Sequence, residues 1–238
     1  EIARIIKEWD RRKIVAMGGA HVSSDPESVL KSPFVDYIVL GEGEIRFPLL
    51  LKQLEKGRAK GIREIDGIGY RVDGKIHIEP LQNFIQDLDS LPHPARELLD
   101  LDRYQMKKKR STMIITSRGC PHGCTYCSAH LVMGRSFRKR SPEGILQEMV
   151  GCQKRYGIQL FDIEDDNFTF DKEHAKRLMD HIIEACGEQV LPTVGPEPCW
   201  FRAGKLELTA MNGVSFASLD EELLRLMKKA GFHTINLS

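Results

Sequence analysis

The sequence ITSRGCPHGCTYCSAH, residues 115–130, contains three cysteines within eight residues, spaced C-x3-C-x2-C. The apolar run at residues 113–116 predicts a short buried strand, so the cysteines lie on the loop that leaves its carboxyl end. Thiolate is a soft ligand that binds zinc or iron–sulfur clusters. The stretch therefore predicts a metal site at the end of a strand, where folds built from repeated strand–helix units place their active sites.

The number of thiols leaves two kinds of metal site open. Structural zinc sites usually close with four ligands, and His122 or His130 is near enough in sequence to supply the fourth. Three thiolates can instead hold a cubane iron–sulfur cluster by three of its irons. The fourth iron then stays open to a substrate, as a catalytic metal requires. Gly119 and Gly123 suit either site, because glycine lets a short loop wrap closely around an inorganic core.

Strands and helices are predicted to alternate after the cysteines. Apolar strands are expected at residues 158–166, 206–212 and 234–238. The helices between them are expected to begin at the caps Ser141, Asp171 and Ser218, the last in a capping box with Glu221. Repeated right-handed strand–helix units of this kind form a parallel barrel or an open parallel sheet. The chain begins in a helix and ends in a strand, so we expect a fragment of a longer protein, cut at both ends.

A second α/β region is predicted before the cysteines. A helix over residues 2–9 precedes short strands at 14–19 and 35–44, which alternate with helices and predict a covered parallel sheet. The stretch GIGYRVDGKIHIE, residues 67–79, predicts a hairpin that turns at Asp73-Gly74. The fold class is therefore α/β. Residues 1–80 are expected to form the C-terminal part of a Rossmann-like parallel-sheet domain, residues 81–110 a linker, and residues 111–238 the first half of a (β/α) barrel.

Composition narrows the class of protein. Of 238 residues, 41% are hydrophobic and 29% are charged, as in soluble globular proteins. No apolar run approaches the ~18 residues of a membrane helix, and the charged first helix is not a signal peptide. A cytoplasmic protein without a membrane span is therefore expected. The remaining cysteines, Cys152, Cys186 and Cys199, are scattered, which favours a metal site at the cluster over a set of disulfides.

Positive charge is concentrated around the cysteines. Residues 103–140 contain ten Lys and Arg and no Asp or Glu, although the net charge of the whole chain is only +1. A positive field there suits an anionic cluster, an anionic ligand or an RNA backbone. A solvated face is the plainer interpretation of the basic run at residues 107–110.

The segment Cys120-Pro-His-Gly-Cys124-Thr-Tyr-Cys127 resembles the cysteine motif of the radical S-adenosylmethionine superfamily. The resemblance implies a [4Fe-4S] cluster held by Cys120, Cys124 and Cys127. It implies that S-adenosylmethionine chelates the open iron through its amine and carboxylate. One electron would then cleave it to a 5'-deoxyadenosyl radical that abstracts hydrogen. Tyr126, the aromatic residue before the last cysteine, would lie near the adenine.

The first third of the chain is similar to the members of this superfamily that carry a cobalamin-binding domain. The similarity rests on GGAHVSS at residues 18–24, VDYIVLGEGE at 35–44, the hairpin, and the segment at 87–104. Gly18 and Gly19 match the Gly-Gly element that lets the backbone approach the cobalamin tail. His21 would contact the cofactor, or is an ordinary loop histidine. The motifs D-x-H-x-x-G and S-x-L, which are more diagnostic of that domain, lie upstream of the Gly-Gly element in the family, and neither occurs before Gly18 in this chain.

Polar residues follow the predicted barrel strands at one expected edge. Asp165 and Asp166 follow the second strand, Asn212 ends the third, and Ser238 ends the fourth. The resemblance implies that these four residues bind S-adenosylmethionine, because relatives contact the cofactor's amino acid or ribose from this edge. Helix-capping acids and ordinary turn polarity are the alternative interpretation.

Three functions are consistent with these patterns. The first is a radical S-adenosylmethionine enzyme, whose specific reaction is either cobalamin-dependent methylation of an unactivated carbon or a ring rearrangement. The second is an RNA-modifying enzyme similar to methylthiotransferases, and the third is a non-catalytic zinc module that binds nucleic acid. The enzyme would need a small-molecule substrate and an electron donor such as flavodoxin or ferredoxin. No residue is predicted to act as a catalytic acid or base.

Overall fold

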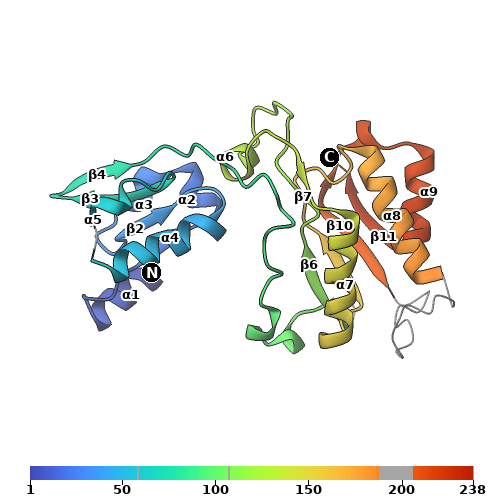
Figure 1. The fold of residues 1–238 in the computed structure, drawn as a ribbon, viewed down its shortest axis with the longest axis horizontal. Coiled ribbons are helices and arrows are strands. Elements are labelled where there is room, and N and C mark those ends of the chain that lie inside the picture. The colour runs from blue at the N-terminus through green and yellow to red at the C-terminus, as the bar shows by residue number, and fades with distance from the viewer. Residues whose placement is uncertain (58, 107, 188–205, 238) are drawn as a thin grey trace. The chain divides into compact units, whose positions relative to one another are not determined.

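A computed structural model describes residues 1–57, 59–106, 108–187 and 206–237 (Figure 1). Ser238, Cys199 and the side chain of Cys186 lie outside the described residues. The chain forms two compact units, each held together by its own contacts. We call Glu1–Gln86 with Cys120–Ser136 the N-terminal unit, and Asp87–Gly119 with Phe137–Ser238 the barrel unit. The domain boundaries expected after residues 80 and 110 stay predictions.

The N-terminal unit contains a four-stranded sheet in the order β1-β2-β3-β4. β1 (Ala16–Gly18) and β2 (Tyr37–Val39) pair in parallel, as the alternation of strands and helices predicted. β3 (Ile68–Val72) and β4 (Lys75–Ile78) form the predicted hairpin, and β3 also pairs antiparallel with β2. The turn residues Asp73 and Gly74 have φ values of 51° and 76°. Both are positive, as a two-residue turn of type I′ requires.

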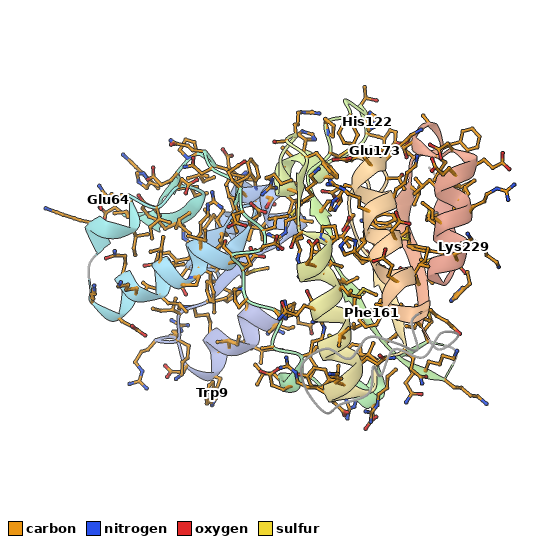
Figure 2. All side chains as sticks on the ribbon, turned by 45° about the vertical axis from the view of Figure 1, so that its right-hand side comes forward. Trp9, Glu64, His122, Phe161, Glu173 and Lys229 are labelled. Atoms are coloured by element: carbon orange, nitrogen blue, oxygen red, sulfur yellow. The ribbon has the colours of Figure 1, made fainter. Side chains whose placement is uncertain are left out.

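Helices surround this sheet. They are α1 (Ile2–Trp9), α2 (Ala20–Ser24), α3 (Pro26–Lys31), α4 (Gly43–Glu55) and α5 (Ala59–Ile62). Asp25 caps α3 by accepting a hydrogen bond from the Ser28 N–H at 3.4 Å, with Pro26 in the first turn. The apolar side chains of α1 are not buried, since Ile2 and Trp9 are 76% and 78% exposed. Trp9 projects outward from the helix in Figure 2.

A buried arginine ties α4 to the segment around the hairpin. The Arg46 guanidinium, 4% exposed, donates to the carbonyl of Glu42 at 3.0 Å and to the Asp66 carboxylate at 2.6 Å. Glu42 in turn accepts the Ile85 N–H at 2.7 Å. These bonds satisfy polar groups that would otherwise be buried without partners, which is costly. They fix the chain that leaves the hairpin against α4.

The barrel unit contains the predicted parallel array. β6 (Lys109–Ile114), β9 (Leu160–Ile163), β10 (Glu207–Val214) and β11 (Phe232–Leu237) pair in parallel. Their spatial order follows their order in the chain, as in a right-handed series of strand–helix units. β5 (Gln105–Met106) extends the sheet antiparallel to β6. The prediction of a partial (β/α) barrel is confirmed.

Three long helices run beside this sheet (Figure 1): α7 (Pro142–Tyr156), α8 (Lys172–Gly187) and α9 (Glu221–Ala230). Shorter elements are η1 (Arg96–Leu98), η2 (Leu101–Arg103), η3 (Phe216–Ser218), β7 (Ser117–Arg118) and β8 (Arg138–Lys139). Ser141 caps α7 by accepting the Gly144 N–H at 3.1 Å, and Gly157 ends the helix with φ 65°. Asp171 caps α8 by accepting the His174 N–H at 3.0 Å.

The predicted cap of α9 is wrong. Asp220, not Ser218, precedes the helix, and its carboxylate accepts the Leu223 N–H at 2.8 Å. The Ser218 hydroxyl instead bonds to Thr169, 49 residues away, and donates to the Ser215 carbonyl. Asp and Ser are comparable caps, so the long-range partner of Ser218 decided between them.

The apolar core of the barrel unit lies between the helices and the strands. Phe161 on β9 is fully buried (Figure 2) and packs with side chains from α7, α8 and α9. Burying one such side chain contributes about 1.5–3 kcal/mol. The inner faces of α7 and α8 are apolar, and these residues on them are all buried: Ile145, Met149, Cys152, Ala175, Leu178, Met179 and Ile182.

An ionic cluster fastens the expected linker to the barrel unit. Arg96, 5% exposed, pairs with Glu148 of α7 at 2.7 Å, and Arg140 pairs with the same carboxylate at 2.6 Å. Arg96 also donates to the Thr112 hydroxyl at 3.0 Å and the Met113 carbonyl at 2.9 Å on β6. The segment around Arg96 is therefore held on the barrel unit and is not a free tether.

Candidate metal and cofactor site

The three clustered cysteines share one loop, between β7 and α6 (Ala129–Met133). All three thiols are free. Cys124 is exposed, and Cys120 and Cys127 are half-buried. His122, between the first two cysteines, lies at the outer end of the loop in Figure 2. Among the described residues, no three His, Cys, Asp or Glu side chains are grouped closely enough to hold a single metal ion.

The second half of the loop packs within the N-terminal unit, to which it belongs. The Cys120 N–H donates to the Gly134 carbonyl at 3.3 Å, which closes the loop, and α6 contacts α2. Gly134 has φ 79°, and a Cβ there would lie 3.0 Å from the Phe84 ring. A side chain at Gly134 would thus be strained by both its backbone and its neighbour. Phe84 and α2 therefore constrain where the loop ends.

Two carboxylates of the barrel unit hold the segment that leads into the loop. Asp165 accepts hydrogen bonds from the Thr116 N–H at 2.7 Å, the Thr116 hydroxyl at 2.5 Å and the Ser117 hydroxyl at 2.7 Å. Asp166 accepts the Gly119 N–H at 3.0 Å. Asp165 and Asp166 thus accept hydrogen bonds from four donors within residues 116–119. These bonds hold the segment immediately before Cys120 in place.

These acids differ in burial. Asp165 is 2% exposed, and burial raises its pKa while its Ser117 and Thr116 donors oppose the rise. Burial also raises the pKa of the half-buried Asp166, against the effect of the Gly119 N–H and of the nearby Arg138 charge. Both oxygens of Asp165 are already bonded within the chain. Its predicted contact with S-adenosylmethionine stays a prediction.

Two further acids lie beside these: Asp162, which the sequence did not single out, is on β9, and Glu164 directly follows that strand. Asp162, 7% exposed, accepts the Thr209 hydroxyl of β10 at 2.6 Å and the Met211 N–H at 3.2 Å. Burial raises the pKa of Glu164, and the charge and hydrogen bond of Asp162 raise it further. The alternation Asp162, Ile163, Glu164 could have revealed this pair, because alternate residues of a strand share one face.

Two other predicted cofactor residues are accessible. Tyr126 is 89% exposed on the cysteine loop. Asn212, also exposed, donates its side-chain amide to the carbonyls of Asp165 at 3.2 Å and Glu164 at 3.4 Å. The ends of β9 and β10 are therefore joined, as expected for neighbouring parallel strands. The roles of Tyr126 and Asn212 toward a cofactor stay predictions.

The Gly-Gly element lies at the end of β1. Gly18, Gly19 and His21 are exposed, and His21 is on α2. A Cβ at Gly18 would lie 3.3 Å from the Val39 carbonyl of β2, whereas one at Gly19 would meet nothing within 4 Å. The φ of 100° at Gly19 explains the glycine there. The backbone at Gly19 is therefore open to a ligand at the carboxyl edge of a parallel pair of strands, where α/β sheets bind ligands.

The donor set fits an iron–sulfur cluster. Three free thiols on one loop are soft ligands of the type that holds such clusters, and one of them, Cys124, is exposed. Gly123, between two of the cysteines, has open space where a side chain would be. Cys152 is unlike these thiols, because it is 4% exposed in the core and burial raises its pKa.

No helix in the described part of the chain is both long and apolar enough to cross a membrane.

Comparison with known sequences connects this site to a family. The family described as the radical SAM superfamily matches residues 114–238, more than half of the chain. An uncharacterized methyltransferase of Pyrococcus horikoshii is 33% identical over 235 residues, covering 98% of this chain and 47% of that protein. Cytidylyl-2-hydroxyethylphosphonate methyltransferase of Streptomyces wedmorensis is 29% identical over 255 residues, covering 94% of this chain and 44% of that protein. The chain spans about half the length of the curated relatives it matches.

A solved structure shares the fold of the whole chain. The radical S-adenosylmethionine methyltransferase TsrM of Kitasatospora setae, with cobalamin and a [4Fe-4S] cluster bound, matches with a TM-score of 0.73 at 20% identity. The match covers 100% of this chain and 44% of that one. It confirms the predicted fold class, and the family match confirms the resemblance carried by the cysteine motif. The chain belongs to the radical S-adenosylmethionine superfamily.

Proposed function

We propose that the chain is the cofactor-binding part of a radical S-adenosylmethionine enzyme, with Cys120, Cys124 and Cys127 as ligands of a [4Fe-4S] cluster. One observation carries the proposal. Three free thiols share the loop that follows the first strand of a parallel barrel array, in a chain of this superfamily. When bound, the cluster supplies the electron that cleaves S-adenosylmethionine to a 5'-deoxyadenosyl radical. Three cysteine ligands leave one iron of the cluster without a protein ligand, and this open position is where S-adenosylmethionine would bind.

The residues around the loop would position the cofactors. Asp165 and Asp166 hold residues 116–119, so Cys120 leaves a fixed segment. Tyr126 is exposed beside the cysteines and can stack on an adenine ring. Asp166 and Asn212, at the ends of adjacent strands, are proposed to bind the amino acid or ribose of S-adenosylmethionine. Ser238 follows β11 and is proposed for the same role on its place in the sequence alone.

We favour methyl transfer with cobalamin as the specific reaction. The support is that both curated relatives described above are named methyltransferases and that the TsrM structure contains cobalamin. Gly18, Gly19 and His21 would contact cobalamin, since Gly19 leaves its backbone open at the sheet edge. A small-molecule substrate, an electron donor such as flavodoxin or ferredoxin, and a cytoplasmic location belong to the same proposal.

The two alternatives have less support. Membership of the superfamily favours an iron–sulfur cluster over a zinc module. The names of the two methyltransferases do not favour RNA modification, although the basic stretch at residues 103–140 would suit an RNA backbone.

Anaerobic reconstitution tests the cluster. The protein should bind iron and sulfide, show the visible absorption of an iron–sulfur cluster, and cleave S-adenosylmethionine after reduction. Cys124→Ala should lose the cluster, whereas Cys152→Ala, which removes a buried thiol of the core, should keep it. Zinc without iron in the wild-type protein, or equal iron in both variants, would contradict the proposal. Cobalamin binding is tested separately, by comparing the wild type with Gly19→Val in equilibrium dialysis.

A further inference from the structure

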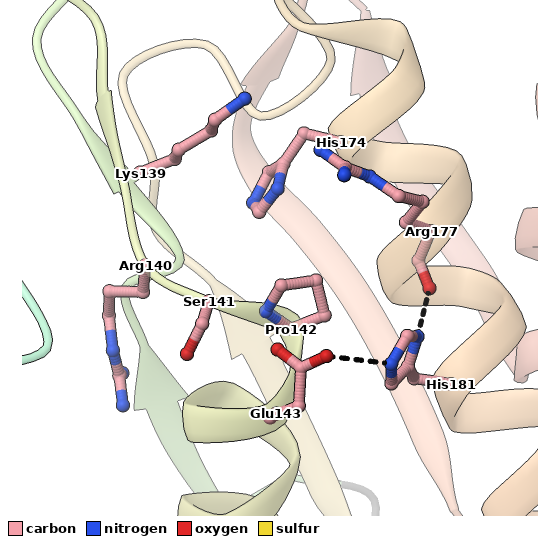
Figure 3. Close-up of a pocket in the computed structure, with 8 residues that line it drawn as sticks. All are labelled: Lys139, Arg140, Ser141, Pro142, Glu143, His174, Arg177 and His181. Carbon is pink, nitrogen blue, oxygen red and sulfur yellow. Dashed lines mark hydrogen bonds and ion pairs between the residues drawn. The ribbon is translucent and has the colours of Figure 1, made fainter.

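A polar pocket lies in the barrel unit, and none of its lining residues belongs to the cysteine loop (Figure 3). Its volume is about 340 Å³, enough for a small ligand. It lies where β8, the first turn of α7 and one face of α8 meet. The lining residues are Lys139, Arg140, Ser141, Pro142, Glu143, His174, Arg177 and His181. Nothing in the proposed cofactor chemistry uses this pocket.

One buried side chain in the pocket lacks a partner. His174 is 2% exposed, and its Nε2 has no hydrogen-bond partner in the described part of the chain. Its ring points into the pocket in Figure 3. Burial lowers the pKa of His174 and the Lys139 charge lowers it further, while the Asp171 carboxylate opposes the fall, so the shift favours the neutral ring. Leaving a buried polar atom unpaired costs about 1–3 kcal/mol, and a bound ligand would recover that energy.

The groups around His174 offer hydrogen-bond donors. Lys139 gives one N–H to Asp171 at 2.5 Å, which leaves up to two for a ligand. The exposed Arg177 side chain makes no hydrogen bond or ion pair that involves another described residue, and Figure 3 shows its guanidinium beside the His174 ring. His174 and Arg177 are three residues apart on α8 and share a face. Donors from β8 and α8 therefore converge on one space.

The acceptors around the pocket are already bonded. Glu143 accepts from His181 Nε2 at 3.1 Å, and Asp171 accepts from Lys139 and from the His174 backbone. Arg140 is bonded to Glu148 and points away from the pocket in Figure 3. The pocket also lies at the N-terminus of α7, a helix of 15 residues, whose dipole favours a negative charge. The negative charges of Glu143, Glu148 and Asp171 balance the positive charges of Lys139, Arg140 and Arg177. The hydrogen-bond donors that have no acceptor therefore select the ligand more than the net charge does.

We propose that this pocket binds a tetrahedral oxyanion of the phosphate class, held by His174 Nε2–H, Arg177 and Lys139. Such an anion carries acceptor oxygens at the corners of a tetrahedron and can face three donors from different directions, which a planar carboxylate does less well. The anion selects the histidine tautomer that carries its proton on Nε2. The ligand is a free phosphate or the phosphate group of a larger molecule that reaches the pocket.

Inorganic phosphate is the probe for this site, added to the complete protein. Nitrogen-detected NMR of the imidazole should show the His174 Nε2 signal shifting on titration, with sulfate acting similarly and acetate binding much more weakly. Arg177→Gln should weaken phosphate binding by about tenfold, equivalent to about 1.4 kcal/mol. Lys154→Gln removes the same charge from an exposed position of α7 outside the pocket and should leave binding unchanged.

Two variants of the histidine separate binding from folding. His174→Gln keeps a donor and should retain part of the affinity, whereas His174→Leu should lose binding. Because Arg177 is exposed, its variant tests the site even if the His174 variants fold poorly. An unchanged His174 signal at millimolar phosphate would overturn the proposal. So would a structure determined with phosphate in which only an ordered water lies at His174 Nε2. Equal weakening by the Lys154 variant, or acetate binding as tightly as phosphate, would overturn it too.

Discussion

The clearest test of how the barrel unit supports the cysteine loop is Asp165→Ala. The carboxylate receives three hydrogen bonds from Thr116 and Ser117, and all three residues are at most 2% exposed. Removing it leaves the Thr116 N–H buried without an acceptor, because a backbone amide cannot turn toward another partner. The two hydroxyls can rotate, so their loss is smaller. Asp165→Ala should also release residues 116–119, which lead directly to Cys120.

The magnitude follows from these contacts. An unsatisfied buried donor costs about 1–3 kcal/mol, and each lost hydrogen bond to a charged group nominally costs about 1.5–3 kcal/mol. The variant no longer buries a carboxylate, which offsets part of that loss and is consistent with the raised pKa of Asp165. We therefore expect a net loss of about 2–4 kcal/mol in the free energy of unfolding. Asp165→Asn keeps an acceptor for the Thr116 N–H and should lose only about 1 kcal/mol.

Two measurements check this prediction. Urea denaturation followed by circular dichroism gives the free energy of unfolding, and hydrogen–deuterium exchange reports on residues 114–119. Both should change for Asp165→Ala, and iron content after reconstitution should fall. If stability and exchange stay at wild-type values while only affinity for S-adenosylmethionine falls, Asp165 binds the cofactor and the positioning argument is refuted.

Three further changes give separate tests. Glu148→Ala leaves the buried guanidinium of Arg96 and the half-buried one of Arg140 without their carboxylate and should cost about 3–5 kcal/mol of unfolding free energy by urea denaturation. A loss below about 1 kcal/mol would contradict the ionic cluster. Gly134→Ala strains a backbone with φ 79° against a neighbouring ring and should lower the iron bound on reconstitution, while Gly123→Ala, in open space, should not; equal loading would refute this. The Leu223 N–H holds the pKa of Asp220 below its usual value, so its stabilisation of α9 is complete above pH ~4 and is lost as pH falls through the lowered pKa. The stability difference between wild type and Asp220→Asn should therefore shrink from pH 6 to pH 3 in urea titrations, and a constant difference would contradict the cap.

Local sequence signals predicted much of the fold correctly. The caps Ser141 and Asp171 and the Asp73-Gly74 turn are confirmed, because each depends on residues within a few positions along the chain. The parallel order of the barrel strands is confirmed for the same reason, since each helix connects neighbouring strands with one handedness.

Long-range contacts escaped prediction. The hairpin pairs with β2 and extends the sheet, and Arg96 in the expected linker is buried against Glu148. Ser218 bonds to Thr169 and leaves the cap of α9 to Asp220. In each case the deciding partner lies far away in sequence, and local propensity carries no information about it.

The sequence by itself determined the chemistry of the site. The spacing of Cys120, Cys124 and Cys127 places three thiols, which are soft donors, on one loop. The apolar run before them predicted that this loop follows a barrel strand, and β6 is that strand. Only the tertiary structure decided what the acids at the next strand end do. Asp165 and Asp166 come within hydrogen-bond distance of residues 116–119 because β6 and β9 are paired in parallel. A carboxylate buried at this strand end needs hydrogen-bond donors, and residues 116–119 supply them.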